Sequence, residues 1–132
     1  MVRGAHFILY VQDQTRARSF YERVLELAPT LDVPGMTEFQ LRDGAVLGLM
    51  PETGILRLLG QALPDPARAS GVPRAEVYLL VDDPARCHAN ALAVGARELA
   101  GLAARDWGHE AAYSLDPDGH VLAFARVQPA ST

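Results

Sequence analysis

The sequence contains little of what marks nucleic-acid-binding, disulfide-rich or membrane-spanning proteins. It has one cysteine, Cys87, so no disulfide framework is possible within the chain. No segment approaches the ~20 apolar residues that a membrane span needs. Lys and Arg do not cluster and the net charge is −4, so neither nucleic acid nor an anionic membrane is an expected partner. The first residues lack the apolar core of a secretory signal, and we therefore expect a cytoplasmic protein.

What the chain does contain is typical of a packed globular protein. Its 132 residues are 49% hydrophobic and 21% charged, which predicts one compact domain over residues 1–132. Neither a phosphate-binding glycine loop nor a nucleophile elbow is present. Function must therefore be sought in the chain's own repeats and side-chain pattern.

An internal repeat dominates the sequence. Residues 5–13 (AHFILYVQD) and 75–83 (AEVYLLVDD) lie 70 positions apart and share Ala, Leu, Val and Asp at equivalent places. Each is an apolar, strand-like run that ends in an aspartate. That aspartate, Asp13 or Asp83, is placed to cap a helix. The repeat therefore predicts two copies of one strand-and-helix unit.

The residues after each capping aspartate have the pattern of a helix. In the first copy the apolar residues follow the stripe of a core-facing helix at Ala17, Phe20, Tyr21, Val24 and Leu25. In the second, Pro84 occupies the first helical position and Gly95 is placed to end the helix.

A hairpin follows each helix. The first turns at Asp43-Gly44, a strong hairpin signal, and the second turns at residues 116–119 (DPDG). We expect units at 1–50 and 74–127, joined by a Pro- and Gly-rich linker at 51–73.

Two segments interrupt the repeat. Residues 55–59 (ILRLL), inside the linker, are apolar enough to predict a short buried turn. Residues 101–110 predict a polar loop that carries the single tryptophan, Trp107, near the rim of a binding site.

The pattern over residues 5–25 and 75–126 resembles the vicinal oxygen chelate superfamily, which includes glyoxalase I, bleomycin resistance proteins and extradiol dioxygenases. The resemblance rests on the helix with Phe20-Tyr21 and on the late DPDG hairpin. It implies an α+β fold of two tandem βαβββ units, whose curled mixed sheets form a cleft for a small organic ligand.

The resemblance also implies four positions around that cleft, at which members with a metal hold it. Here they carry His6, Gly48, Glu76 and Ala123. Gly and Ala have no donor atom, and a protein-held divalent ion needs three or four ligands. We therefore expect no four-ligand metal site. A divalent metal (Ni, Zn, Fe or Mn) would depend on His6 and Glu76 with help from further donors, which could be His109, Glu110, Asp106 or Glu38. The two small residues predict room for a bulkier apolar ligand.

Strand alternation indicates which side chains share the cleft face. His6, Ile8 and Tyr10 lie on one face of the first strand, whereas Phe7, Leu9 and Val11 lie on the face that packs against helices. By the same rule Glu76 shares its face with Tyr78 and Leu80. The expected ligand-binding residues are His6, Tyr10, Gly48, Met50, Glu76, Tyr78, Trp107 and Ala123.

Each candidate also has a structural interpretation. His6 can be a hydrogen-bonded strand residue, Glu76 can pair with Arg74 in water, and Trp107 can anchor its loop on the sheet. The sequence leaves these alternatives open.

Three functions fit these observations. The first is a binding protein that sequesters a small molecule without an essential metal. The second is a glyoxalase I-like enzyme in which His6 and Glu76 hold a metal or act as an acid–base pair. The third is an interaction module whose cleft is filled by its own side chains. The resemblance and the leucines of residues 55–59 also favour a homodimer.

Overall fold

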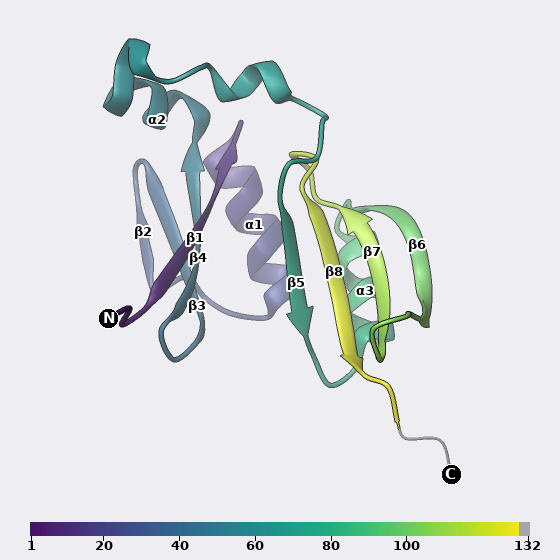
Figure 1. Cartoon of the computed structure of the whole chain (residues 1–132). Helices are drawn as coiled ribbons and strands as arrows, with labels where there is room; N and C mark the ends of the chain where they lie inside the picture. Colours follow the sequence, from purple (N-terminus) through teal and green to yellow (C-terminus); the bar gives the residue numbers. More distant parts are fainter. Residues whose placement is uncertain (130–132) are drawn as a thin grey trace. The chain divides into compact units, whose positions relative to one another are not determined.

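The computed structural model describes residues 1–129 and has an α+β fold with two open, four-stranded mixed sheets (Figure 1). The chain divides into two compact units, one of Met1–Ser70 and one that begins at Gly71. Each unit runs strand, helix and three further strands, so the predicted α+β architecture of tandem βαβββ units is confirmed.

The first unit contains one sheet with strand order β1-β4-β3-β2, and β1 and β4 are parallel. Its βαβββ elements are β1 (Ala5–Val11), α1 (Gln14–Leu25), β2 (Leu31–Val33), β3 (Met36–Arg42) and β4 (Ala45–Pro51). The remainder of the unit holds α2 (Glu52–Leu59) and two short 3-10 turns, η1 (Gly60–Ala62) and η2 (Pro66–Ala69).

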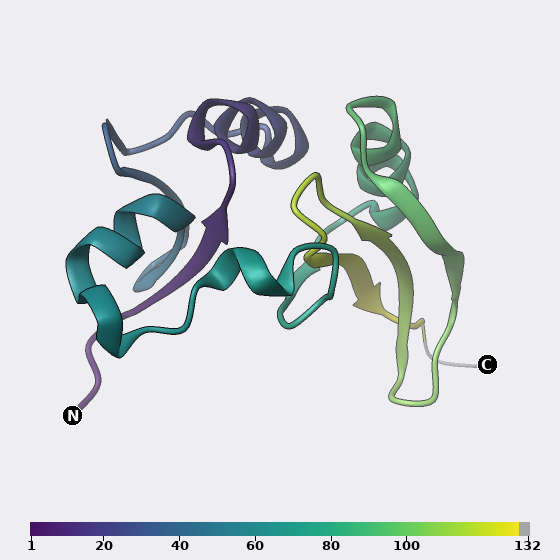
Figure 2. The same cartoon turned by 90° about the horizontal axis from the view of Figure 1, so that it is seen from above.

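The second unit repeats this topology with strand order β5-β8-β7-β6, and here β5 and β8 are parallel. Its elements are β5 (Glu76–Leu80), α3 (Pro84–Ala93), β6 (Arg97–Ala104), β7 (His109–Leu115) and β8 (Val121–Val127). Helix α3 lies along one face of its sheet, against β7 and β8 (Figure 2).

The helix caps predicted from the repeat are present. Asp13 Oδ1 accepts a hydrogen bond from Arg16 N at 3.0 Å, and Asp83 Oδ1 accepts one from Arg86 N at 3.1 Å. These bonds satisfy backbone N–H groups that have no partner within the first helical turn. Of the predicted apolar stripe on α1, four side chains are buried and Leu25 is half-buried.

Strand β1 differs in one respect from the alternation prediction. Leu9 and Val11 are buried as expected, but Phe7, which was expected to pack against helices, is 66% exposed. Leu9 and Val11 are on the same face of the same strand. Alternation therefore predicts the face on which a side chain lies, but not how much of that face is covered.

The linker prediction is corrected by α2. Residues 55–59 form part of an eight-residue helix rather than a buried turn, and within that helix only Ile55 is buried. Leu58 and Leu59 are 69% and 48% exposed. The apolar spacing of this segment is helical, so a single side faces the rest of the unit.

The predicted polar loop at residues 101–110 is also shorter than expected. Residues 101–104 continue strand β6, and His109 and Glu110 begin β7, so the turn between the two strands is residues 105–108. Small residues in this stretch obscured the strand because they have weak β propensity.

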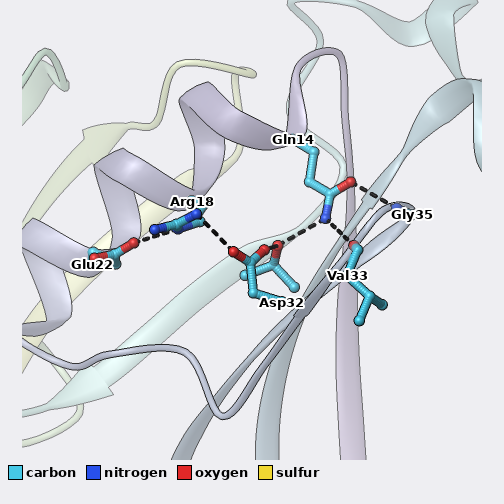
Figure 3. Close-up of polar contacts among 7 residues, drawn as sticks. Gln14, Arg18, Glu22, Asp32, Val33 and Gly35 are labelled. Carbon is cyan, nitrogen blue, oxygen red and sulfur yellow. Dashed lines mark hydrogen bonds and ion pairs between the residues drawn. The ribbon is translucent and has the colours of Figure 1, made fainter.

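A polar network holds α1 to the β2–β3 hairpin. Gln14 Nε2 donates to Val33 O and Thr37 Oγ1, and Gln14 Oε1 accepts from Gly35 N (Figure 3). One turn later, Arg18 Nη1 donates to Asp32 Oδ2 at 2.7 Å. The hydrogen bond that Arg18 Nε donates to Glu22, with the charges of Asp32 and Glu22, raises the pKa of Arg18 above its ordinary value.

Among residues 1–129, no helix combines the length and the apolar character that crossing a bilayer demands.

Candidate functional site

The first unit presents His6 beside a carboxylate that sequence reasoning did not include among the ligand-binding residues. His6 on β1 lies 3.2 Å from Glu38 on β3, measured from Nδ1 to Oε2. The sheet order places β4 between these two strands, and Glu38 is in register with Gly48. The pair therefore spans β4.

The space beside Gly48 is already occupied. A Cβ atom at this position would lie 3.1 Å from Ile8 Cγ1 and 3.4 Å from Met36 Sδ. The room predicted here for a bulky ligand is therefore filled by side chains of the same sheet. Of the other predicted residues in this unit, Tyr10 is 38% exposed on β1 and Met50 is half-buried on β4.

The second unit contains a cluster of three side chains in which Tyr78 is hydrogen-bonded to the other two. Trp107 Nε1 donates to Tyr78 Oη at 3.0 Å, and Tyr78 Oη lies 2.6 Å from His109 Nδ1. The rings of Tyr78 and His109 are also stacked, with centroids 5.7 Å apart and planes 28° from parallel. We call these three residues the aromatic triad.

Small residues on the central strand make the triad possible. Tyr78 belongs to β5 and His109 to β7, and β8 lies between them. The side chain of Tyr78 must therefore cross β8, where Ala123 and Ala125 are in register with Tyr78 and Leu80. Both alanines are fully buried. Ala123, which was predicted to leave room for a ligand, belongs to the floor beneath this crossing.

Backbone contacts fix the turn that carries Trp107. The Arg105 guanidinium donates to Gly101 O and Ala111 O, and Arg105 N donates to His109 O. Gly108 has a φ of 87°, a left-handed conformation that favours glycine. The turn is therefore held at both ends, and Trp107 is held with it.

A second tyrosine flanks Ala123 on the other side. Tyr113 on β7 is in register with Ala123, and the Arg105 guanidinium lies 5.2 Å from the centre of its ring. Burial raises the pKa of Tyr113, and the charges of Glu76 and Tyr78 raise it further, whereas Arg105 lowers it. Glu76 itself is exposed at the start of β5.

The structure brings some predicted residues together and leaves others apart. Tyr78 and Trp107 are hydrogen-bonded to each other. His6 contacts Glu38, which is not one of the predicted ligand-binding residues. His6 belongs to the first unit and Glu76 to the second, so their shared pocket stays a prediction.

Sequence reasoning considered Glu38 and His109 only as donors to a metal and did not consider Tyr113. Glu38 and Tyr113 each stand six residues before the turn glycine of their hairpin, and each is in register with one of the small residues, Gly48 or Ala123. Counting back along the hairpins would therefore have placed both beside these small residues. No such count would have paired His109 with Tyr78, because the neighbours of His109 were interpreted as a loop.

The residues at the four metal positions do not fit a four-ligand metal site. Gly48 and Ala123 carry no donor atom. Within either unit of the described residues 1–129, no three His, Cys, Asp or Glu side chains lie close enough together to hold an ion. Glu38 stands next to Gly48 but is paired with His6, and Glu110 is paired with Arg126 at 2.7 Å.

Solved structures with the same fold cover nearly the whole chain. A glyoxalase-related enzyme from Fulvimarina pelagi is 22% identical with a TM-score of 0.79, over 96% of this chain and 88% of the other. A glyoxalase/bleomycin resistance protein/dioxygenase from Nocardioides is 18% identical with a TM-score of 0.75, over 97% and 85% of the two chains. At these identities the likeness establishes the fold alone.

A third structure gives the same result. A glyoxalase/bleomycin resistance protein/dioxygenase family enzyme from Burkholderia phytofirmans is 17% identical with a TM-score of 0.75, over 92% of this chain and 96% of the other. No curated protein matches the sequence significantly. The family model that matches residues 3–124 covers both repeats, and the chain therefore belongs to the Glyoxalase/Bleomycin resistance protein/Dioxygenase superfamily.

Proposed function

We propose that the protein binds a small organic ligand at the cleft-face residues of its two units and needs no four-ligand metal site. The proposed binding residues are His6, Tyr10, Gly48, Met50, Glu76, Tyr78, Trp107 and Ala123. The observation that carries the proposal is the aromatic triad, in which Tyr78 Oη lies between Trp107 Nε1 and His109 Nδ1. Polar groups placed among aromatic rings are typical of small-molecule sites.

The proposed role is to sequester the ligand in the cytoplasm. Trp107 supports this because it is 56% exposed although its turn is held by backbone hydrogen bonds. A large apolar side chain that stays exposed on a fixed turn is available to cover a flat molecule.

The alternative is a metal-dependent lyase of the glyoxalase I type that uses His6 and Glu76 with loop donors. One observation favours it. Metal-ligating histidines almost always have a carboxylate or other acceptor at their second ring nitrogen, and Glu38 is so placed beside His6 Nδ1. The missing donors at Gly48 and Ala123 make it the weaker of the two proposals.

Naphthalene binding tests the main proposal. Because Trp107 is the single tryptophan, its fluorescence reports on this site alone. We expect naphthalene to quench that fluorescence and raise the melting temperature, and decalin, which is not flat, to do neither. If naphthalene changes neither quantity, the site is filled by the protein's own side chains and the binding proposal is wrong.

Metal analysis of the same preparation separates the alternative. We expect less than a tenth of an equivalent of Ni, Zn, Fe or Mn. About one equivalent that is lost in His6→Ala would contradict the metal-free proposal and favour the lyase.

A further inference from the structure

The hydrogen bonds of the aromatic triad meet at the hydroxyl of Tyr78. An indole N–H can only donate, so Tyr78 Oη accepts from Trp107. The tyrosine keeps one hydrogen to give, and His109 Nδ1, 2.6 Å away, accepts it in the tautomer whose own hydrogen is on Nε2. In that tautomer, the one on which our proposal rests, the chain of donors passes from Trp107 through Tyr78 to His109.

The chain ends in a donor without an acceptor. Within the part of the chain that the structure describes, no group is hydrogen-bonded to His109 Nε2. The ring is half-buried, so this N–H is near the surface of the unit. Successive hydrogen bonds polarise one another, which strengthens the last donor of the chain. Such an N–H favours an oxygen from outside the protein.

The surroundings of this donor select the shape of its partner. The stacked rings of Tyr78 and His109 lie beside Trp107, which is more than half exposed. Flat aromatic molecules pack well on such rings. Resting on the proposed binding function, we propose that the ligand is a planar aromatic compound with a carbonyl, carboxylate or phenolic oxygen, which accepts a hydrogen bond from His109 Nε2.

Two matched probes test this proposal. 2-Acetonaphthone carries a carbonyl oxygen, and 2-isopropenylnaphthalene replaces that oxygen with a CH₂ group of nearly the same shape. One neutral hydrogen bond is worth about 1 kcal/mol, so we expect 2-acetonaphthone to bind about fivefold more tightly. Trp107 fluorescence and calorimetry measure the two affinities.

Substitutions then assign the effect to the triad. His109→Phe keeps a ring and removes the donor, so the affinity ratio falls to about one while 2-isopropenylnaphthalene still binds. Tyr78→Phe leaves His109 in place but ends the chain of donors, so the ratio falls partway. His120→Phe makes the same change in the imidazole that is paired with Asp116 at the β7–β8 turn, and is the matched control, which keeps the fivefold ratio. Circular dichroism checks that each variant is folded.

The outcomes distinguish this inference from the binding proposal beneath it. If both probes bind the unchanged protein equally well, ligand binding stands and the role of His109 Nε2 is wrong. A preference that survives His109→Phe also overturns that role. If neither probe binds, both proposals fail together.

Discussion

Tyr78 connects three segments of the second unit through one oxygen atom. Its hydroxyl receives the N–H of Trp107 from the β6–β7 turn and contacts His109 at the start of β7. Because the tyrosine reaches across β8, the alanines at positions 123 and 125 are part of the same arrangement. The triad therefore lies over two fully buried alanines of β8.

The pKa of Tyr113 tests which neighbouring side chains act on this residue. Burial is the largest cause of its raised pKa, with Glu76 next, so Glu76→Gln lowers the pKa of Tyr113 but leaves it above the ordinary value of about 10. Arg105→Gln removes a cation and raises the pKa further. Ultraviolet titration, with Tyr113→Phe as the reference for the other tyrosines, measures both changes. An unchanged pKa in Glu76→Gln would contradict this account.

The same raised pKa predicts how stability depends on pH. The folded protein holds the Tyr113 proton more tightly than the unfolded chain, so this contribution is fully present below about pH 10. Stability is then lost as the pH rises through the raised pKa.

Among the elements, α1 depends on Gln14 for its attachment to the β2–β3 hairpin. Gln14 makes three hydrogen bonds, to Val33 O, Thr37 Oγ1 and Gly35 N (Figure 3). Its position at the first residue of the helix allows it to reach the tip of the hairpin. Together with the ion pair of Arg18 and Asp32, these bonds attach α1 to β2, a strand of three residues.

We therefore expect Gln14→Ala to lower the free energy of unfolding by about 1–3 kcal/mol, because Thr37 and the hairpin backbone lose a partner. Urea denaturation measures the change. Gln61→Ala, on an exposed residue of η1, is the control and changes stability by less than about 0.5 kcal/mol. Equal losses in the two variants would show that Gln14 has no special role.

At the scale of the whole molecule, we expect a homodimer. Leu58 and Leu59 on α2 are exposed, and burying such side chains at a subunit contact stabilises association. Light scattering at micromolar concentration should give twice the mass of 14.3 kDa. The double substitution Leu58→Glu and Leu59→Glu should give the monomer mass, whereas Leu99→Glu, on an exposed leucine of β6, should not. A monomer mass for the unchanged protein contradicts the prediction.

The two units have the same topology but different polar side chains on their sheets. Their sheets have equivalent strand orders, and Gly48 and Ala123 occupy equivalent places on the strands β4 and β8. Over the first lies a histidine–carboxylate pair, and beside the second lies the aromatic triad. Two repeats of one fold can therefore carry different functional side chains on sheets of the same strand order.

The sequence by itself determined the repeat, the helix caps at Asp13 and Asp83, and the hairpins at Gly44 and Gly119. These features are local, because capping and turn geometry depend on residues a few positions apart. The sequence also identified the lack of donors at Gly48 and Ala123, which needs no coordinates. It misjudged Phe7 and residues 55–59, because burial depends on what lies beside a strand or helix.

Tertiary structure alone decided which polar groups meet. His6 and Glu38 are 32 residues apart, and Tyr78 and His109 are 31 apart, and each pair forms across an intervening strand. Such a contact requires both the strand order and the register, and the side chain of Tyr78 also crosses a strand with alanines at positions 123 and 125. Pattern along the chain gives each residue its face of the sheet, but the neighbours on that face come from strands distant in sequence.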